Sequence, residues 1–512
     1  MGDAGARQAG LLSFLASLLS LVTGLLFSVL VARRLALEDY GAWQFYSTVI
    51  SYLMLPGVVV NFWLTRDLGH GRRVLKTGVV SCGLLGALTS FILVGSSIMS
   101  SSVAPINMDV LLALVANLIA FYLSSSLDSA SIGVAPSLYG VGLIVQETVK
   151  VIAGAILVVW LRTGLLGAIL SIDIALFSKV ATMYLKMPPV ARGELDISIG
   201  LLWLRRSWVP ILSLLPGLLS SFDILILAWL VGSTRQAAYL ALAKTVAAAA
   251  GYPQRLAISL ESKLLGGKGD EHIEESIRLV MMFALPMTAG LVVLALPIAY
   301  VFGRNYSPAA VPLQLLSLAS FLSIIYGISL TILQGAERVD TQVGVSSGDI
   351  IRSSLAMPRV IETVARALCV LASLVVLSLV RTWDPSSEAS VTILALMNLL
   401  VTLALSLSML RMSRRTHGYV VPWRDLSRYA LATIVMTLAL LGLYPVGAIS
   451  DRIFDVLVNL LPVVVAGGMV YFTVLLAIDQ RLRNELREVG NVWRARRKSQ
   501  RQKDLHPAES ER

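Results

Sequence analysis

The strongest constraint in this sequence is an uncharged run with charges crowded at both of its ends. Trp43 to Trp63 holds 21 residues without a formal charge, between the charged segments Arg33–Asp39 and Arg66–Arg73. A helix needs about 20 apolar residues to cross the roughly 30 Å hydrocarbon core of a bilayer. The charges therefore predict two membrane surfaces, and Arg33–Asp39 is predicted to link two spanning helices.

A weak copy of this unit returns about 197 residues later in the chain. Four identical residues and one pair of basic residues align: Thr48 with Thr245, Val49 with Val246, Pro56 with Pro253, Gly69 with Gly266, and Arg66 with Lys263. A proline inside a membrane helix bends it, so the matched prolines predict a paired bend that would suit a hinged carrier. Two copies of a spanning unit predict a transporter with two halves.

Composition places the whole chain in a membrane. Hydrophobic residues make up 56% of its 512 residues and charged residues 14%, where a soluble domain carries about 25% charged residues. The apolar runs are continuous, which predicts an all-α, polytopic membrane protein. Two cysteines inside apolar runs and four histidines without ligand spacing predict neither a disulfide framework nor a metal site, and we expect no cofactor.

Apolar runs bounded by charge or turn residues predict about fourteen transmembrane helices. Their ranges are 10–32, 43–65, 77–99, 109–127, 139–161, 163–185, 206–231, 236–260, 276–302, 310–334, 358–381, 386–411, 425–447 and 453–478. The first of these is interpreted as a retained helix, because no cleavage site of small residues follows it.

The arginines and lysines predict the orientation. About 30 of the 42 fall on the surface that carries both termini and about 7 on the other, so both termini are predicted to be cytoplasmic in a cell-membrane protein. The net charge of +11 is accordingly assigned to cationic loops and a basic tail that contact anionic lipids, and no nucleic-acid partner is expected. The predicted outer loops are too short to hold a catalytic domain.

Several ionisable residues fall inside the predicted spans, where each costs about 2.5 to 3.5 kcal/mol unless it has a partner or a watery cavity. The basic ones are Lys150, Lys179, Lys244, Arg255 and Arg366, and the acidic ones are Glu147, Asp173, Asp223 and Glu362. The spacing of Glu147 from Lys150 and of Glu362 from Arg366 predicts local ion pairs.

The other buried charges leave alternatives open. Asp173 lies on a different helix face from Lys179 and does not neutralise it within the helix. Asp223 and Lys244 either meet across their helical hairpin as a structural pair or both face a central cavity. Arg255 is near a span end, where it either extends to the headgroups or turns inward.

An arginine pair at the predicted outer surface, Arg33–Arg34, runs against the charge rule. Either Glu38–Asp39 neutralises the pair, or one of the arginines turns inward to meet an anionic ligand. Together the buried basic groups outnumber the buried acids, so a cavity lined by them would attract an anion such as a phosphate.

Four stretches resemble the multidrug/oligosaccharidyl-lipid/polysaccharide (MOP) exporter superfamily, and within it the polysaccharide (O-antigen type) flippases. They are Ala32–Trp43 with its acidic-Tyr-Gly turn, Thr163–Leu170 (TGLLGAIL), the hairpin Asp223–Lys244, and Pro286–Ala310, which ends in VFGRNYSPAA. The resemblance implies two pseudo-symmetric six-helix bundles plus two C-terminal helices. The expected domains are 1–190, 191–411, the extra helices 412–479 and a basic cytoplasmic tail 480–512.

The resemblance also implies a flippase that moves a polyprenyl-(pyro)phosphate-linked oligosaccharide by alternating access for cell-surface polysaccharide biosynthesis, alongside glycan-assembly membrane proteins. We expect the anion to be bound by the basic residues at depth and at span ends: Arg33, Arg66, Lys150, Lys179, Lys244 and Arg255. Asp223 and Glu147 are the candidates for binding a counter-ion such as Na⁺ or H⁺. Outward movement of negative charge already gains about 2.3 kcal/mol per charge at 100 mV, so ion coupling is not required.

Three other functions compete with this hypothesis. A cation-coupled multidrug exporter of the same superfamily would need acids deep in the first bundle, and the first three spans have acids only at their ends. A membrane glycosyltransferase or polymerase would need catalytic residues on sizeable outer loops, so we expect no enzyme. A scaffolding protein would tolerate neutral residues at Lys179 and Lys244.

Overall fold

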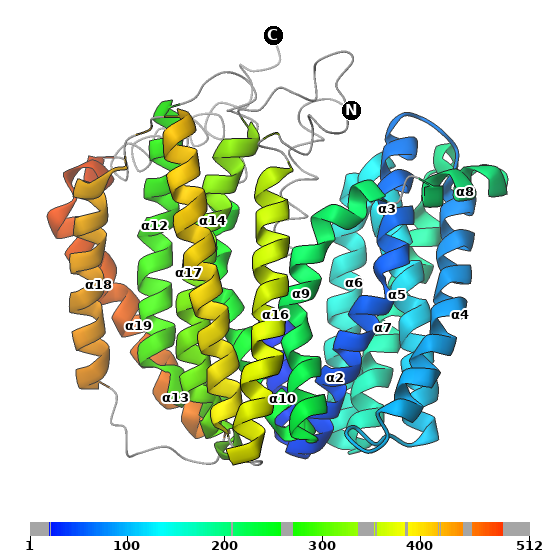
Figure 1. Ribbon diagram of the computed structural model, residues 1–512, viewed down its shortest axis with the longest axis horizontal. Coiled ribbons are helices and arrows are strands. Elements are labelled where there is room, and N and C mark those ends of the chain that lie inside the picture. Colours follow the sequence, from blue (N-terminus) through cyan, green and yellow to red (C-terminus); the bar gives the residue numbers. More distant parts are fainter. Residues whose placement is uncertain are drawn as a thin grey trace, which may run out of the picture.

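The structure, a computed structural model, describes residues 20, 22–205, 208–257, 270–335, 353, 356–383, 388–417, 419, 421–443 and 453–484. Most of the linker predicted at 335–357, most of the basic tail and much of the first predicted span lie outside these residues. The described part is helical throughout and contains no strand. Figure 1 shows the helices running side by side between two ends, as an all-α membrane protein requires.

The helices of the first half follow residues 22–34, which are also helical. They are α2 Leu37–Leu53, α3 Leu55–Gly69, α4 Leu75–Met99, α5 Met108–Val134, α6 Pro136–Gly154, the π-helix η1 Ala155–Trp160, α7 Gly164–Lys186, the 3₁₀ turn η2 Pro189–Ala191 and α8 Ile197–Arg205.

The helices of the second half and the C-terminal pair follow. They are α9 Trp208–Val231, α10 Thr234–Ala247, the 3₁₀ helix η3 Ala248–Ala257, α12 Asp270–Val293, α13 Ala295–Phe302, η4 Arg304–Ala309, α14 Ala310–Gly335, α16 Met357–Trp383, α17 Ala389–His417, α18 Trp423–Leu443 and α19 Ile453–Ile478.

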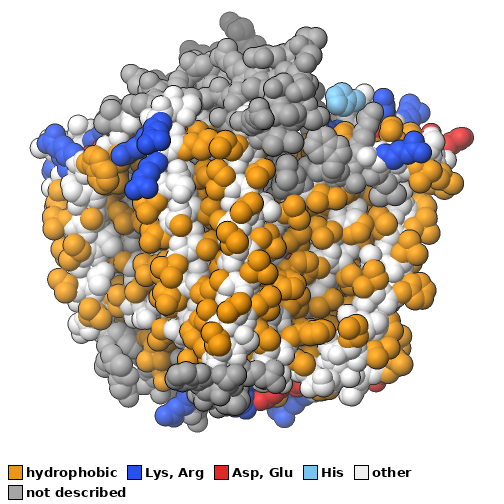
Figure 2. Space-filling view, viewed as in Figure 1, with side chains coloured by type: hydrophobic (Ala, Val, Ile, Leu, Met, Phe, Trp, Pro, Cys, Tyr) orange, Lys and Arg blue, Asp and Glu red, His pale blue; other side chains and the backbone are white. Residues whose placement is uncertain are grey.

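The membrane-spanning character is confirmed. Within the described residues, 11 helices are long and apolar enough to cross a bilayer, and α2 with α3 forms a bent pair that raises this number to 12. Of the fourteen predicted spans, the first is only partly described, and the eighth corresponds to α10 continued by η3, which falls outside that set. Figure 2 shows a broad belt of hydrophobic side chains, with charged side chains concentrated above and below it.

Two groups of helices divide the molecule. In Figure 1, α2 to α7 form one bundle, and α9, α10, α12 to α14, α16 and α17 form the other, with α18 and α19 packed at the far side of the second. The first bundle packs mainly through α5 against α3, α4 and α7, and the second through α14 against α12 and α17. The halves touch where α2 meets α9 and α10.

The matched prolines mark irregular helices in both halves. The bent pair α2–α3 turns by 50° at Met54, beside Pro56 in the first turn of α3. The carbonyl of Leu53 at the break accepts a hydrogen bond of 2.5 Å from the hydroxyl of Tyr122 on α5, which satisfies the group in an apolar environment. In the second half, regular α-helix ends at Ala247, and Pro253 lies in the 3₁₀ helix that follows. The chain therefore departs from α-helical geometry near both matched positions.

The short helix α8 lies across one end of the first bundle (Figure 1). Asp196 caps its first turn by accepting hydrogen bonds from the backbone N–H and the hydroxyl of Ser198 at 2.9 and 2.5 Å. The Ser198 hydroxyl lowers the pKa of the Asp196 carboxyl, which favours the charged cap. Ile197 and Leu201 point outward, with 69% and 56% of their surface exposed, and are placed to enter the membrane surface.

Trp203 attaches α8 to the bundle, and its replacement by phenylalanine tests that attachment. Trp203 is 2% exposed, and its indole N–H donates to the Asp67 carboxylate on α3 at 3.0 Å. Because a hydrogen bond to a charged group contributes about 1.5–3 kcal/mol, Trp203→Phe is expected to lower the stability of the purified protein by roughly that amount. Limited proteolysis at the 187–197 linker should become faster, whereas the exposed control Leu201→Ala should leave the rate unchanged.

Candidate functional site

The two halves are joined at the end of the molecule that holds the start of α2, which the charge distribution predicts to be the outer end. There Arg235, at the start of α10, donates two hydrogen bonds to one oxygen of Glu38, from Nη2 at 2.7 Å and from Nε at 3.0 Å. The Thr234 hydroxyl donates to the Glu38 carbonyl at 2.9 Å. We call these contacts, together with those of Arg33 below, the seam. They close this end with one ion pair and several hydrogen bonds.

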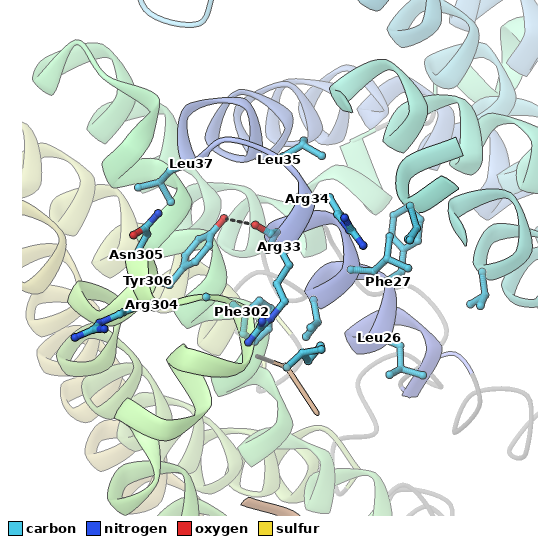
Figure 3. A pocket seen from close by; sticks show the side chains of 17 residues that line it. Leu26, Phe27, Arg33, Arg34, Leu35, Leu37, Phe302, Arg304, Asn305 and Tyr306 are labelled. Atoms are coloured by element: carbon cyan, nitrogen blue, oxygen red, sulfur yellow. Dashed lines mark hydrogen bonds between the residues drawn. The ribbon is translucent and has the colours of Figure 1, made fainter. Parts of the chain in front are cut away.

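Arg33 crosses the same seam. Its guanidinium donates to the carbonyl oxygens of Val301 and Tyr300, both on α13, at 2.7 and 2.8 Å. Next to it, the buried hydroxyl of Tyr306 lies 3.5 Å from the carbonyl oxygen of Ala32, the contact drawn in Figure 3. Glu38 pairs with Arg235, so the expected neutralisation of Arg33 by Glu38 is not what the structure shows. Arg33 instead joins the two halves.

Lys179 is buried within the first half. Its ammonium donates to the Asp128 carboxylate on α5 at 2.7 Å and to the Gln146 amide oxygen on α6 at 3.0 Å. Only 3% of Lys179 is exposed, so the carboxylate compensates the cost of burying the charge. Asp128 is not among the charges expected inside the membrane, because the predicted fourth span ends at residue 127, whereas α5 continues to Val134.

Glu147 and Lys150 form the predicted pair on α6, with 2.7 Å between their charged atoms. Glu147 also accepts hydrogen bonds from the hydroxyls of Ser20 and Thr23, which tie α6 to the first helix. Lys150 further lies over the ring of Phe27, 5.8 Å from its centroid. Both oxygens of the Glu147 carboxylate thus have partners in this structure.

Asp223 and Lys244 meet across their hairpin, one of the two alternatives left open by the sequence. The Lys244 ammonium donates to Asp223 at 2.5 Å and to the Ser220 carbonyl oxygen at 2.8 Å. Asp223 also lines a small cavity between α9, α16 and α17, together with Arg366 and Asn398. The second predicted local pair, Glu362 with Arg366, is present as well, at 3.6 Å.

Arg66 and Arg255 complete the residues expected from the sequence. Arg66 lies near the end of α3 opposite the seam, over the ring of Phe62 at 5.4 Å, and lines a surface recess with His70 and Trp203. The backbone of Arg255 belongs to η3, but its side chain lies outside the described part of the structure. The basic residues are therefore distributed over both halves and both ends, and the structure does not gather them in one cluster.

Asp173, which helical spacing already separates from Lys179, has a different neighbour in the structure. One of its oxygens accepts a hydrogen bond of 2.6 Å from the side-chain amide of Asn117 on α5, and the other has no hydrogen-bond partner among the described residues. Asp173 is 4% exposed. Among the described residues, no group of three or more His, Cys, Asp or Glu side chains could hold a metal ion.

The arrangement of two helical bundles joined at one end is similar to that of solved structures from the MOP exporter superfamily. Among solved structures, the chain is similar to one described as the lipid II flippase MurJ in an inward closed conformation, with a TM-score of 0.62 and 14% identity over 92% of this chain and 99% of that chain. It is also similar to the inward-facing conformation of a multidrug resistance MATE family transporter of that superfamily. In that match the TM-score is 0.56 at 12% identity, over 78% of this chain and 94% of the other.

These likenesses confirm the predicted fold class and the suspected superfamily fold, for a protein with many membrane spans. No protein-family model matches the chain, and a search of curated proteins also finds no match. The two solved structures are described as a flippase and a multidrug transporter.

Proposed function

We propose that this protein is a flippase that moves a lipid-linked anionic glycan, carried on a polyprenyl (pyro)phosphate, from the inner to the outer leaflet of the cytoplasmic membrane. The observation that carries the proposal is the extent of the structural likeness. The flippase structure accounts for 92% of this chain and the multidrug transporter for 78%. The flippase structure therefore matches a larger share of this chain than the multidrug transporter does, which supports the flippase as the better template for the whole molecule.

The ion pairs give the proposed flippase a way to hold and release an anion. Lys179 and Lys244 each keep a carboxylate partner in this structure, which makes burial of their charges tolerable while no substrate is bound. A phosphate that reaches these ammonium groups would compete with the carboxylates for them. Arg33, Arg66, Lys150 and Arg255 are the further candidates for this role, and Asp223 and Glu147 would then be free to take a proton or a cation.

The test is genetic, with variants that remove charge without leaving a lone buried ion. Deletion of the gene in its host should leave the lipid-linked glycan on the inner leaflet, and the wild-type gene should clear it. A gene carrying Lys179→Met with Asp128→Asn and Lys244→Met with Asp223→Asn should produce a folded protein that fails to clear it. Normal clearance of the glycan by that variant would mean that neither Lys179 nor Lys244 is needed to bind the substrate.

A cation-coupled multidrug exporter is the second candidate, favoured by Asp173. This acid lies deep in the first half, with one oxygen unpartnered among the described residues, and a proton-coupled exporter needs such an acid. The exporter would expel cationic dyes in exchange for protons that enter down their gradient. Asp173→Asn would abolish this efflux. The flippase should transport its glycan lipid with Asp173→Asn almost as fast as with the wild-type residue, because the amide oxygen can still accept the hydrogen bond from Asn117.

A further inference from the structure

A cavity of about 900 Å³ opens beside the seam, at the predicted outer end of the molecule. Its walls come from four separate parts of the chain: residues 26–37, α6 with η1, the segment 302–306, and the start of α19. It therefore lies where the first half, the second half and the C-terminal pair come together. Figure 3 shows Arg33 in its centre, with Phe27 and Leu26 on one side and Tyr306 on the other.

The lining of this cavity combines apolar walls with cations. Its described lining side chains include three arginines, Arg33, Arg34 and Arg304, and among these described residues there is no aspartate or glutamate. Most of the others are apolar: Leu26, Phe27, Val29, Leu30, Leu35, Leu37, Val151, Val159, Phe302 and Ile453. Within the described lining, the positive charge of the arginines is not balanced by acids.

The three arginines have different roles. Arg33 is held by the carbonyl oxygens of Tyr300 and Val301, as described above. Arg34 and Arg304 are both exposed, and for neither of them is an ion pair or hydrogen bond found among the described residues. Two guanidinium groups are thus available at the cavity, at the level where a bilayer would place its headgroups.

The apolar part of the cavity faces outward. Leu26, on its wall, is 56% exposed, and such exposure of a leucine on a membrane-protein helix is expected where the side chain meets lipid. A guanidinium group forms two parallel hydrogen bonds with a phosphate, and an acyl or prenyl chain fits an apolar wall. An anionic ligand without a hydrocarbon tail would leave that wall uncovered.

We infer that this cavity is a binding site for a phosphate-bearing lipid of the outer leaflet, with its headgroup held by the positive potential of Arg34 and Arg304, which lie on either side of Arg33 (Figure 3), and its chain along Leu26, Leu30 and Val151. The site also accounts for the arginines at residues 33 and 34, whose place on the outer surface runs against the usual charge distribution. It does not depend on the transported substrate, because an anionic membrane lipid such as a phosphatidylglycerol has the required chemistry.

Native mass spectrometry of the full-length protein tests the site directly. The protein, in detergent, receives equal amounts of dioleoylphosphatidylglycerol and dioleoylphosphatidylcholine, and the lipids that remain bound are counted. We expect the phosphatidylglycerol to be retained preferentially. The double variant Arg34→Gln/Arg304→Gln should weaken this retention by about 25-fold, about fivefold for each arginine. The matched control is Arg162→Gln, which removes an exposed arginine after η1 that does not line the cavity.

Two results would overturn the inference. One is equal retention of the two lipids by the wild-type protein. The other is retention of phosphatidylglycerol by the double variant at the level of the wild type or of Arg162→Gln. A competition experiment with water-soluble glycerol phosphate distinguishes a lipid headgroup from a free phosphate ester as the ligand. If a hundredfold excess of glycerol phosphate does not displace the lipid, the site is a lipid site. Displacement at equal concentration contradicts the inference. Thermal unfolding of each variant confirms that it is folded, since both arginines are at the surface.

Discussion

Replacing Lys179 by methionine alone is expected to destabilise the protein by about 3–5 kcal/mol, and replacing Asp128 by asparagine as well is expected to recover most of that loss. The ammonium and the carboxylate are 2.7 Å apart, with 4% and 24% of their side chains exposed. Removing one partner leaves a buried charge uncompensated, whereas removing both leaves none. The measurement is the free energy of unfolding of the two variants and the wild type in the same detergent.

The control for this prediction is an ion pair of similar geometry outside the proposed site. Arg278 on α12 and Asp425 on α18 are 2.8 Å apart and 13% and 17% exposed, and they belong to a network in which Arg278 also pairs with Glu274 and Asp425 with Arg428. Arg278→Met/Asp425→Asn should leave transport intact, whereas Lys179→Met/Asp128→Asn should abolish it. Two results would show that burial does not couple the two charges. One is a loss of less than about 1 kcal/mol in the free energy of unfolding for Lys179→Met, and the other is a double variant that is no more stable than the single one.

Replacing Gly41 by alanine is expected to open the seam. A methyl group at Gly41 would come within 1.9 Å of the Thr234 carbonyl oxygen, a backbone atom that cannot move without displacing the start of α10. Overpacking of this kind costs about 1–3 kcal/mol, and only the state closed at this end bears the cost. The equilibrium should therefore shift by about fivefold to 150-fold toward a state in which α2 and α10 have separated.

Distances between two spin labels, measured by double electron–electron resonance, report this shift. Spin labels at Asp109 and Asn305, exposed residues at the same end of the two halves, would be attached after Cys82 and Cys369 are replaced by alanine. Gly41→Ala should increase the population of longer distances. Gly95→Ala, where the added methyl has no atom within 4 Å, should leave the distribution of the parent protein unchanged. An unchanged distribution in Gly41→Ala would mean that the seam does not hold the halves together.

The sequence was sufficient for the helices and for the pairs that lie close along the chain. Runs of apolar residues mark spans because backbone groups in lipid must be satisfied within a helix. Glu147 with Lys150, and Glu362 with Arg366, are set by helical periodicity, so spacing alone predicts them. The irregular α2–α3 junction could be expected from Pro56, because a proline interrupts the hydrogen bonds of a helix and bends it.

Contacts between distant segments were beyond reach from one sequence. The partner of Lys179 comes from another helix, 51 residues away, and a boundary error at the end of α5 removed Asp128 from consideration. The pairing of Glu38 with Arg235, separated by 197 residues, depends on how the halves meet. The cavity at Arg34 and Arg304 likewise needs four segments in place, although the unusual outer position of Arg33–Arg34 already pointed to it.

The most direct measurement of the central claim is flipping by the purified protein in liposomes. A fluorescent sugar linked to a polyprenyl phosphate is placed in both leaflets, and a reagent that cannot cross the membrane bleaches only the outer leaflet. The account predicts that wild-type protein makes nearly all of the fluorescence accessible, that Lys179→Met/Asp128→Asn stops at the outer half, and that a neutral polyprenol-linked dye is not moved. Failure of the wild-type protein to move the phosphate-linked lipid, with efflux of a cationic dye that depends on Asp173, would contradict it.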